Sequence, residues 1–346
     1  MKEVSSQRRE IDIDIIIPFH IENELLQLAI KSALESTGVS TRLILVNDTG
    51  LPISRSHFPM RSHDVLVLTE TRGYSSALTR GILEVSSKSV AFLDSDDTIH
   101  PKKLSIQFRK LVEENLDLVS STLVKVDNFG NPFPRRTLLG EVPRENLNPF
   151  DLLLLGAHGA DSSMLIKSDL LKASWSVHSK FPSVYADYGW FWTLPGDVKT
   201  GHSPEAIYYY RAHSAQMSRN PEMLESWNKV SSTVTSNLGK TSLSIQKSFQ
   251  GVINPRILLA LAFPSSLVSL TRTERVQFVA LARRLMSEFP TDSKHSKRFL
   301  RRTLARRALI VSRFMEVSLY SYLPGFIIDV LIHGLSSYKP RVGKKI

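Results

Sequence analysis

The 346-residue sequence contains no cysteine, which excludes disulfide bonds, cysteine-ligated zinc and a thiol nucleophile. It also lacks a long hydrophobic run. The longest stretch without charge, Ile257 to Thr271, is shorter than about 18 residues and contains Pro264, so it predicts a buried helix rather than a membrane span. The first ten residues, MKEVSSQRRE, are charged and lack the apolar centre of a signal peptide. We therefore expect a cytoplasmic protein.

Acidic residues are scarce in the last third of the sequence. The whole chain has 44 Lys and Arg against 33 Asp and Glu, a net charge of +11. From Asn220 onward there are 20 basic and 7 acidic residues, a net +13, which leaves −2 for residues 1–219. This asymmetry predicts two parts. Residues 1–219 would form a catalytic or ligand-binding domain, and residues 220–346 a basic, mainly helical region that faces an anionic partner.

Residues 11–125 alternate short β-branched runs with amphipathic stretches, a pattern typical of an α/β domain with a mostly parallel central sheet. Apolar runs predict strands at 13–17, 43–46, 65–68 and 90–93, and further strands at 163–167 and 206–210. Helical periodicity predicts helices at 23–36, at 74–86 and from 101 to about 115.

Polar residues follow the first four predicted strands. Pro18 ends the first strand, Asp48 follows the second, and Arg72 follows the third. The segment DSDD, residues 94–97, follows the fourth. Because open α/β sheets bind ligands at the carboxyl ends of their strands, we expect these side chains to line one site.

The segment VAFLDSDDTIHP places Asp94, Asp96 and Asp97 within four positions. Like charges at such spacing repel unless a cation or hydrogen-bond donors neutralise them. Mg²⁺ and Mn²⁺ are commonly held by one or two carboxylates together with phosphate oxygens of a substrate, so one interpretation is a metal site. The other is that Asp96 or Asp97 caps the helix that begins near Pro101. Three clustered carboxylates favour the functional site.

The same segment also resembles the D-x-D-x-T motif of haloacid-dehalogenase-type phosphatases. There Asp94 would be the nucleophile, Asp96 the acid and base, and Thr98 a helper. Those enzymes usually place the motif on their first strand, whereas here a strand, helix and strand with polar ends come first. The late paired-aspartate motif that completes their magnesium site is also missing, and Gly196-Asp197 is a poor substitute.

Taken together, six segments resemble glycosyltransferase family 2 in order and spacing, over roughly residues 11–218. They are DIIIPFHIENELLQLAIKSAL, LILVNDTG, TRGYSSALTRGI, VAFLDSDDTIHP, VYADYGWFW and PEAIYYYRAHSAQMS. The resemblance implies the GT-A fold, a Rossmann-like nucleotide-sugar-binding domain. It also implies inverting, metal-dependent transfer of a sugar from a nucleotide-sugar donor, a UDP-sugar, to a hydroxyl of a glycan or lipid-linked acceptor. The expected setting is bacterial cell-surface polysaccharide synthesis.

By this resemblance, the donor-binding residues are Pro18, Asp48, Arg72, Asp94 and Asp96. Asp48 would hydrogen-bond the base of the nucleotide, and Asp94 and Asp96 would hold the ribose and the sugar.

The resemblance also implies a metal site and a general base. Asp97, with Asp96, would bind the Mn²⁺ or Mg²⁺ ion that neutralises the diphosphate leaving group. His213 in YYYRAH matches a histidine that reaches the metal or the diphosphate, and Asp187 in VYADYGW matches the base that deprotonates the acceptor. Departures such as Asn47, which replaces the first acid of the family's usual Asp-Asp pair, bear on the donor's identity more than on the metal or the base.

Residues 294–315 predict a helix with an arginine face and an apolar face. Such a helix suits an anionic membrane surface and predicts peripheral binding at the inner face of the cell membrane. Alternatively, its apolar face packs on the transferase domain and the arginines are solvated. No nucleic-acid recognition motif accompanies it, so nucleic acid is not an expected partner. Outside the enzymes, the alternative is a non-catalytic membrane-associated scaffold of the same fold, against which Asp97 and Asp187 argue.

Overall fold

The fold is described here from a computed structural model, in which residues 10–133, 161–178, 190, 193–213, 257 and 270–288 are described. The chain divides into two compact units: residues 1–152 with 158–212, and residues 153–157 with 213–346. The domain boundary predicted between residues 219 and 220 falls outside the described residues and stays a prediction. In the second unit, the described helix is α10 (Arg272–Glu288). The predicted cationic helix at 294–315 also lies outside the described residues, as does most of the apolar stretch 257–271.

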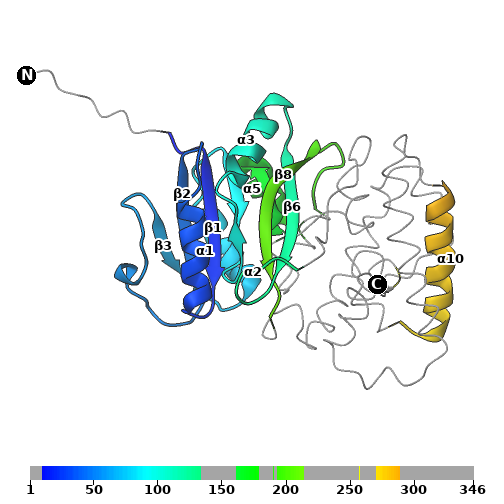
Figure 1. The fold of residues 1–346 in the computed structure, drawn as a ribbon, viewed down its shortest axis with the longest axis horizontal. Coiled ribbons are helices and arrows are strands. Elements are labelled where there is room, and N and C mark those ends of the chain that lie inside the picture. The colour runs from blue at the N-terminus through cyan, green and yellow to red at the C-terminus, as the bar shows by residue number, and fades with distance from the viewer. Residues whose placement is uncertain are drawn as a thin grey trace, which may run out of the picture. The chain divides into compact units, whose positions relative to one another are not determined.

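A mixed sheet forms the centre of the first unit. Its eight strands are arranged in the order β3-β2-β1-β4-β7-β6-β8-β5. Figure 1 shows β3, β2 and β1 next to one another at one end of this sheet. The strands are β1 (Ile13–Phe19), β2 (Thr41–Asn47), β3 (Val65–Leu68), β4 (Ser89–Phe92), β5 (Thr98–Ile99), β6 (Leu118–Val126), β7 (Met164–Lys167) and β8 (Thr200–Arg211). The neighbours β3, β2, β1 and β4 are parallel, and so are β6 and β8. The sheet is mixed because β7 runs antiparallel to β4 and β6, and β5 runs antiparallel to β8.

Helices cover both faces of this sheet. They are α1 (Glu24–Leu34), α2 (Tyr74–Leu83), α3 (Lys103–Glu113) and α5 (Ser168–His178), with short 3-10 turns η1 (Arg55–His57) and η2 (Asp161–Ser163). Apolar side chains of α1 and α3 share one buried cluster with Ile13, Ile15 and Ile17 of β1. The alternate residue Ile16 faces α2, where a Cβ on Gly81 would lie only 2.6 Å from Ile16 Cγ2. Within the described part of the chain, no helix is long and apolar enough to span a membrane.

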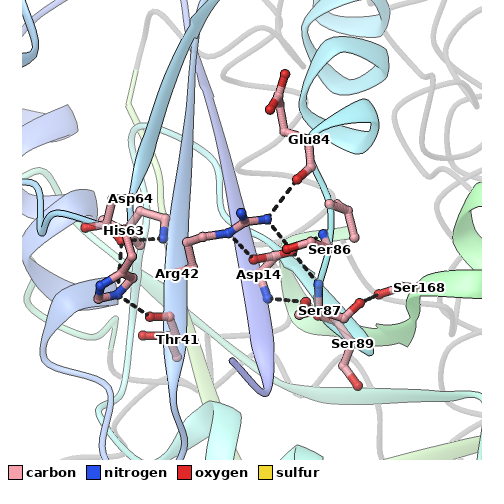
Figure 2. Close-up of polar contacts among 12 residues, drawn as sticks. Asp14, Thr41, Arg42, His63, Asp64, Glu84, Ser86, Ser87, Ser89 and Ser168 are labelled. Atoms are coloured by element: carbon pink, nitrogen blue, oxygen red, sulfur yellow. Dashed lines mark hydrogen bonds and ion pairs between the residues drawn. The ribbon is translucent and has the colours of Figure 1, made fainter. Parts of the chain in front are cut away.

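A buried ion pair fixes the amino-terminal edge of the sheet (Figure 2). Asp14 of β1 is fully buried, and its carboxylate accepts hydrogen bonds from the backbone N–H groups of Ser86 and Ser87 at 2.7 and 2.9 Å. The Arg42 guanidinium of β2 donates to both Asp14 oxygens, at 2.7 and 2.9 Å, and to the carbonyl of Glu84. Because residues 84–88 join α2 to β4, this network sets β4 beside β1 and leaves the opposite, carboxyl-terminal edge for a site.

Candidate functional site

The candidate site lies at the carboxyl ends of β1 and β4. In the parallel part of the sheet, β1 has β2 on one side and β4 on the other, so the chain order reverses between β1 and β4. Open α/β sheets bind their ligands outside the carboxyl ends of the strands at such a switch point. Leu93, which follows β4, donates its backbone N–H to the carbonyl of Ile16 at 3.0 Å. This bond brings the segment that follows, residues 94–97, beside the end of β1; we call it the acidic loop.

Within the acidic loop, Asp94 and Asp96 are half-buried and Asp97 is 1% exposed. The backbone N–H of Asp97 donates to the carbonyl of Asp94 at 3.2 Å, which closes the loop into a turn. The two carboxylate oxygens of Asp94 lie near two phenol groups, at 3.3 Å from the Tyr74 hydroxyl and 3.5 Å from the Tyr208 hydroxyl. The loop therefore presents two carboxylates at its half-buried positions and buries the third.

The buried carboxylate of Asp97 is engaged by protein donors. Its Oδ1 accepts the backbone N–H of Arg211 at 2.6 Å, and its Oδ2 accepts the hydroxyl of Tyr208. Burial raises the pKa of Asp97 well above its usual range and the charge of Asp96 raises it further, while the Arg211 and Tyr208 hydrogen bonds partly oppose that rise. Burial also raises the pKa of Tyr208, which keeps its hydroxyl protonated as a donor. A metal bound by Asp97 would have to compete with both hydrogen bonds, and its predicted ligand role stays a prediction.

Asp48 and Arg72, predicted to contact the donor, come together at the ends of β2 and β3. Asp48 is 7% exposed, and its carboxylate accepts the Thr69 hydroxyl at 2.9 Å and the Gly73 N–H at 2.9 and 3.0 Å. Gly73 begins α2 at φ 129, where a side chain would be strained, so Asp48 also anchors the start of that helix. Arg72 is exposed, and its Nε donates to the Asp48 carbonyl at 3.3 Å.

The remaining predicted site residues are Pro18, His213 and Asp187. Pro18 lies inside β1, paired with Val46 of β2. His213 is half-buried two residues after β8 and belongs to the second unit. Asp187, the predicted general base, lies outside the described residues. The roles proposed for these residues therefore stay predictions.

The acidic loop fits a metal only if a substrate supplies ligands. Among the described residues, no three His, Asp or Glu side chains are placed to share a metal ion. A divalent ion that binds with a nucleotide needs no more than one or two carboxylates, because phosphate oxygens and water fill its remaining positions. The half-buried carboxylates of Asp94 and Asp96 meet that requirement.

Three residues of the site were not singled out from the sequence: Tyr74, Tyr208 and Arg211. Tyr208 and Arg211 belong to β8, whose pairing with β5 brings them to the acidic loop. Tyr74 is the first residue of α2. Aromatic and arginine side chains at such positions are common in packed cores, so the sequence offers no local signal for them.

Comparison with known proteins places this site in a family. The protein-family model described as "Glycosyl transferase family 2" matches residues 14–174, from β1 into α5, and this match includes the acidic loop. The glycosyltransferase YibD of Escherichia coli K12, described as uncharacterized, is 26% identical over 110 residues, which cover 31% of this chain and 32% of YibD. The succinoglycan biosynthesis protein ExoO of Rhizobium meliloti is 28% identical over 123 residues, 32% of this chain and 34% of ExoO. Residues 14–174 thus match glycosyltransferase family 2, as the sequence predicted, and the chain spans about a third of the length of these relatives.

Solved structures extend the similarity beyond the family domain. The structure of S. aureus TarS residues 1–349 in complex with UDP has 14% identity and a TM-score of 0.52, covering 88% of this chain and 90% of that one. The complex of the same protein with UDP-GlcNAc gives 13% identity and a TM-score of 0.50 with the same coverage. At this identity the similarity shows the fold alone. The predicted α/β fold class of the GT-A type is confirmed.

Proposed function

We propose that the chain is a metal-dependent, inverting glycosyltransferase that moves a sugar from a UDP-sugar to a hydroxyl of a glycan or lipid-linked acceptor. The observation that carries this proposal is the acidic loop at the carboxyl end of β4, beside β1, within a family 2 domain. The family match also favours this activity over the phosphatase interpretation of the same aspartates and over a non-catalytic scaffold.

The nature of the donor is supported by the structural neighbours. TarS, which shares the fold, has been solved with UDP and with UDP-GlcNAc. In this chain, Asp48 and Arg72 lie together at the ends of β2 and β3, a position suited to the base and the phosphates of a nucleotide. The name of ExoO supports a role in polysaccharide synthesis.

The chemistry is divided between two groups of side chains. Asp96, with Asp94 in place of the predicted Asp97, would hold a Mn²⁺ or Mg²⁺ ion that neutralises charge on the departing nucleoside diphosphate. His213 is a further proposed ligand. We prefer Asp94 to Asp97 because two protein groups already donate hydrogen bonds to the Asp97 carboxylate. On the other side of the sugar, Asp187 would accept the proton of the attacking hydroxyl. Attack from the face opposite the leaving group gives inversion at the anomeric carbon.

Nucleotide and metal binding test the donor proposal directly. We expect UDP with Mn²⁺ to raise the melting temperature of the full chain, and UDP without metal to do so much less. A panel of nucleotide-sugars, assayed for Mn²⁺-dependent hydrolysis, would identify the sugar. A chain that neither binds UDP with Mn²⁺ nor hydrolyses any member of the panel would refute the proposal.

The base is tested by Asp187→Asn. This variant should lose about 100-fold or more of its transfer activity, because proton transfer to a positioned base contributes roughly 10²–10⁴-fold. It should still bind UDP with Mn²⁺. Asp197→Asn, at an exposed aspartate ten residues later, is the matched control and should transfer at the wild-type rate. Undiminished turnover by the Asp187 variant would overturn the assignment.

The basic region is proposed to bind the membrane surface peripherally. Flotation with anionic liposomes at low salt should recover the full chain with the lipid, and about 0.5 M salt should release it, because screening weakens such attraction. A chain that stays with the soluble fractions at low salt would exclude this mode of binding.

A further inference from the structure

We propose that Asp97, Tyr208 and Arg211 form a latch that holds the acidic loop against β8 and so sets the positions of Asp94 and Asp96. In this arrangement Asp97 binds protein donors rather than the metal, and Tyr208 and Arg211 are positioning residues for the metal and the nucleoside diphosphate. The inference rests on the proposed function, because it concerns how the donor site is kept in shape.

The first observation is the short connection between the acidic loop and the sheet. The loop continues directly into β5, which is only two residues long and pairs with β8 through Thr98 with Tyr209 and Ile99 with Tyr208. Two paired residues restrain the loop only weakly, and its three aspartates repel one another. The buried side chain of Asp97 adds two further bonds to the same strand, one to the hydroxyl of Tyr208 and one to the N–H of Arg211.

Tyr208 lies between two of the loop's carboxylates. Its side chain is fully buried, and its hydroxyl contacts Oδ2 of Asp97 and lies 3.5 Å from Oδ2 of Asp94. A phenol hydroxyl has one proton to donate, and the closer partner is Asp97. Asp94 is thereby held beside the hydroxyl while Tyr74 contacts its other oxygen at 3.3 Å. Loss of the Tyr208 hydroxyl would therefore remove the hydrogen bond to Asp97 and the contact with Asp94 at the same time.

Arg211 holds the backbone of the loop. It is 3% exposed, and its Nε donates to the carbonyl of Asp96 at 2.9 Å. Its Nη1 donates to the carbonyls of Asp127 and Asn128, at 3.1 and 2.7 Å, in the turn that follows β6. These three bonds all go to main-chain oxygens, so they fix where the backbone at Asp96 lies and tie it to a second loop.

The latch predicts a result that direct metal ligation by Asp97 does not. If Asp97 were a ligand, its charge would be essential, and asparagine would fail as badly as alanine. If Asp97 is part of the latch, asparagine still offers an oxygen to the Arg211 N–H and an amide N–H to the Tyr208 oxygen. Asparagine should therefore rescue much of what alanine loses.

The test measures Mn²⁺ affinity of the full chain in the presence of UDP, by electron paramagnetic resonance of free Mn²⁺. Tyr208→Phe removes one hydroxyl from a buried ring and should weaken Mn²⁺ binding by about 10-fold or more, because the buried carboxyl group of Asp97 loses its hydroxyl partner. Tyr209→Phe, at the half-buried neighbour on the same strand, is the control and should leave the affinity unchanged. Equal affinities of the wild type and Tyr208→Phe would overturn the latch.

The second comparison is between two substitutions of Asp97. Asp97→Asn should bind Mn²⁺ at least about 10-fold more tightly than Asp97→Ala, since it keeps the two hydrogen bonds. Equal, severe losses in both would show that Asp97 is a ligand and would overturn the inference. If Asp97→Ala does not fold, the Tyr208→Phe result decides alone. A wild-type chain without Mn²⁺-dependent UDP binding would instead refute the proposed function, and the latch with it.

Discussion

Lys103, the first residue of α3, is expected to destabilise the protein at neutral pH. It is fully buried, and among the described residues its Nζ has no hydrogen-bond partner. Burial lowers its pKa from 10.5 to about 7. The unfolded chain therefore binds a proton that the folded chain lacks between about pH 7 and 10.5, and stability rises with pH in that window by about 1.4 kcal/mol per unit. Below pH 7 both states hold the proton, and the full penalty remains.

Lys103→Met removes the titrating group and keeps a side chain of similar length. The shift above gives a stabilisation of about 4 kcal/mol at pH 7 that shrinks to about 2 kcal/mol at pH 9. Urea unfolding of the full chain at pH 7, 8 and 9 measures both values. Lys102→Met, at the exposed neighbouring lysine, is the control and should change stability little at any pH.

The pH dependence is the decisive part of this prediction. Methionine on the apolar side of a helix can stabilise simply by packing, but that gain would be the same at every pH. A variant that is more stable by a constant amount, or less stable than the wild type, would show that Lys103 is protonated in the folded chain. It would then have to be stabilised by groups or water beyond the partners described.

Two further substitutions test the packing of the sheet. Gly81→Ala should lower the free energy of unfolding by about 1–3 kcal/mol, because its Cβ would overlap Ile16 Cγ2 at 2.6 Å. Thermal melting measures this effect, and an unchanged melting temperature would show that α2 shifts to accommodate the methyl group. Asp14→Asn should cost about 3–5 kcal/mol in urea unfolding, because it leaves the guanidinium of Arg42 without its buried partner. Glu10→Gln, in an exposed ion pair with Lys88, is the control and should change stability little. An effect at Asp14 as small as that at Glu10 would contradict the stabilising role of the Asp14–Arg42 ion pair shown in Figure 2.

The central strands could be predicted because they are buried on both faces. The runs predicted at 13–17 and 43–46 lie inside β1 and β2, which are buried. The run at 65–68 coincides with β3, although β3 is a half-buried strand at the edge of the sheet. Strands of parallel sheets covered by helices are nearly continuous apolar runs, which a sequence shows without an alignment. The same reasoning predicted that the polar residues lie at the carboxyl ends of the strands, where Asp48, Arg72 and the acidic loop are found.

Strand β6 could not be predicted in the same way. Its segment LVSSTLVKV has three consecutive hydroxyl residues, Ser120 to Thr122, that break the apolar run. All three are buried in the sheet, where the Ser120 hydroxyl bonds His202 and the Thr122 hydroxyl donates to the carbonyl of Pro204 at 2.8 Å. Partners supplied by β8, some 80 residues later, make Ser120 and Thr122 acceptable inside the fold, whereas the Ser121 hydroxyl has no hydrogen-bond partner among the described residues. Sequence periodicity carries no information about such partners.

The acidic loop shows the same limit in the site itself. Its three aspartates indicate that positive charge or donors must lie nearby, and this much follows from repulsion alone. The sequence does not say which carboxylate receives which partner. Asp96 and Asp97 are adjacent, yet one is half-buried and the other meets donors 111 and 114 residues away on β8. The register of β5 on β8 makes that choice, so tertiary pairing rather than the motif decides which of the aspartates is buried against β8.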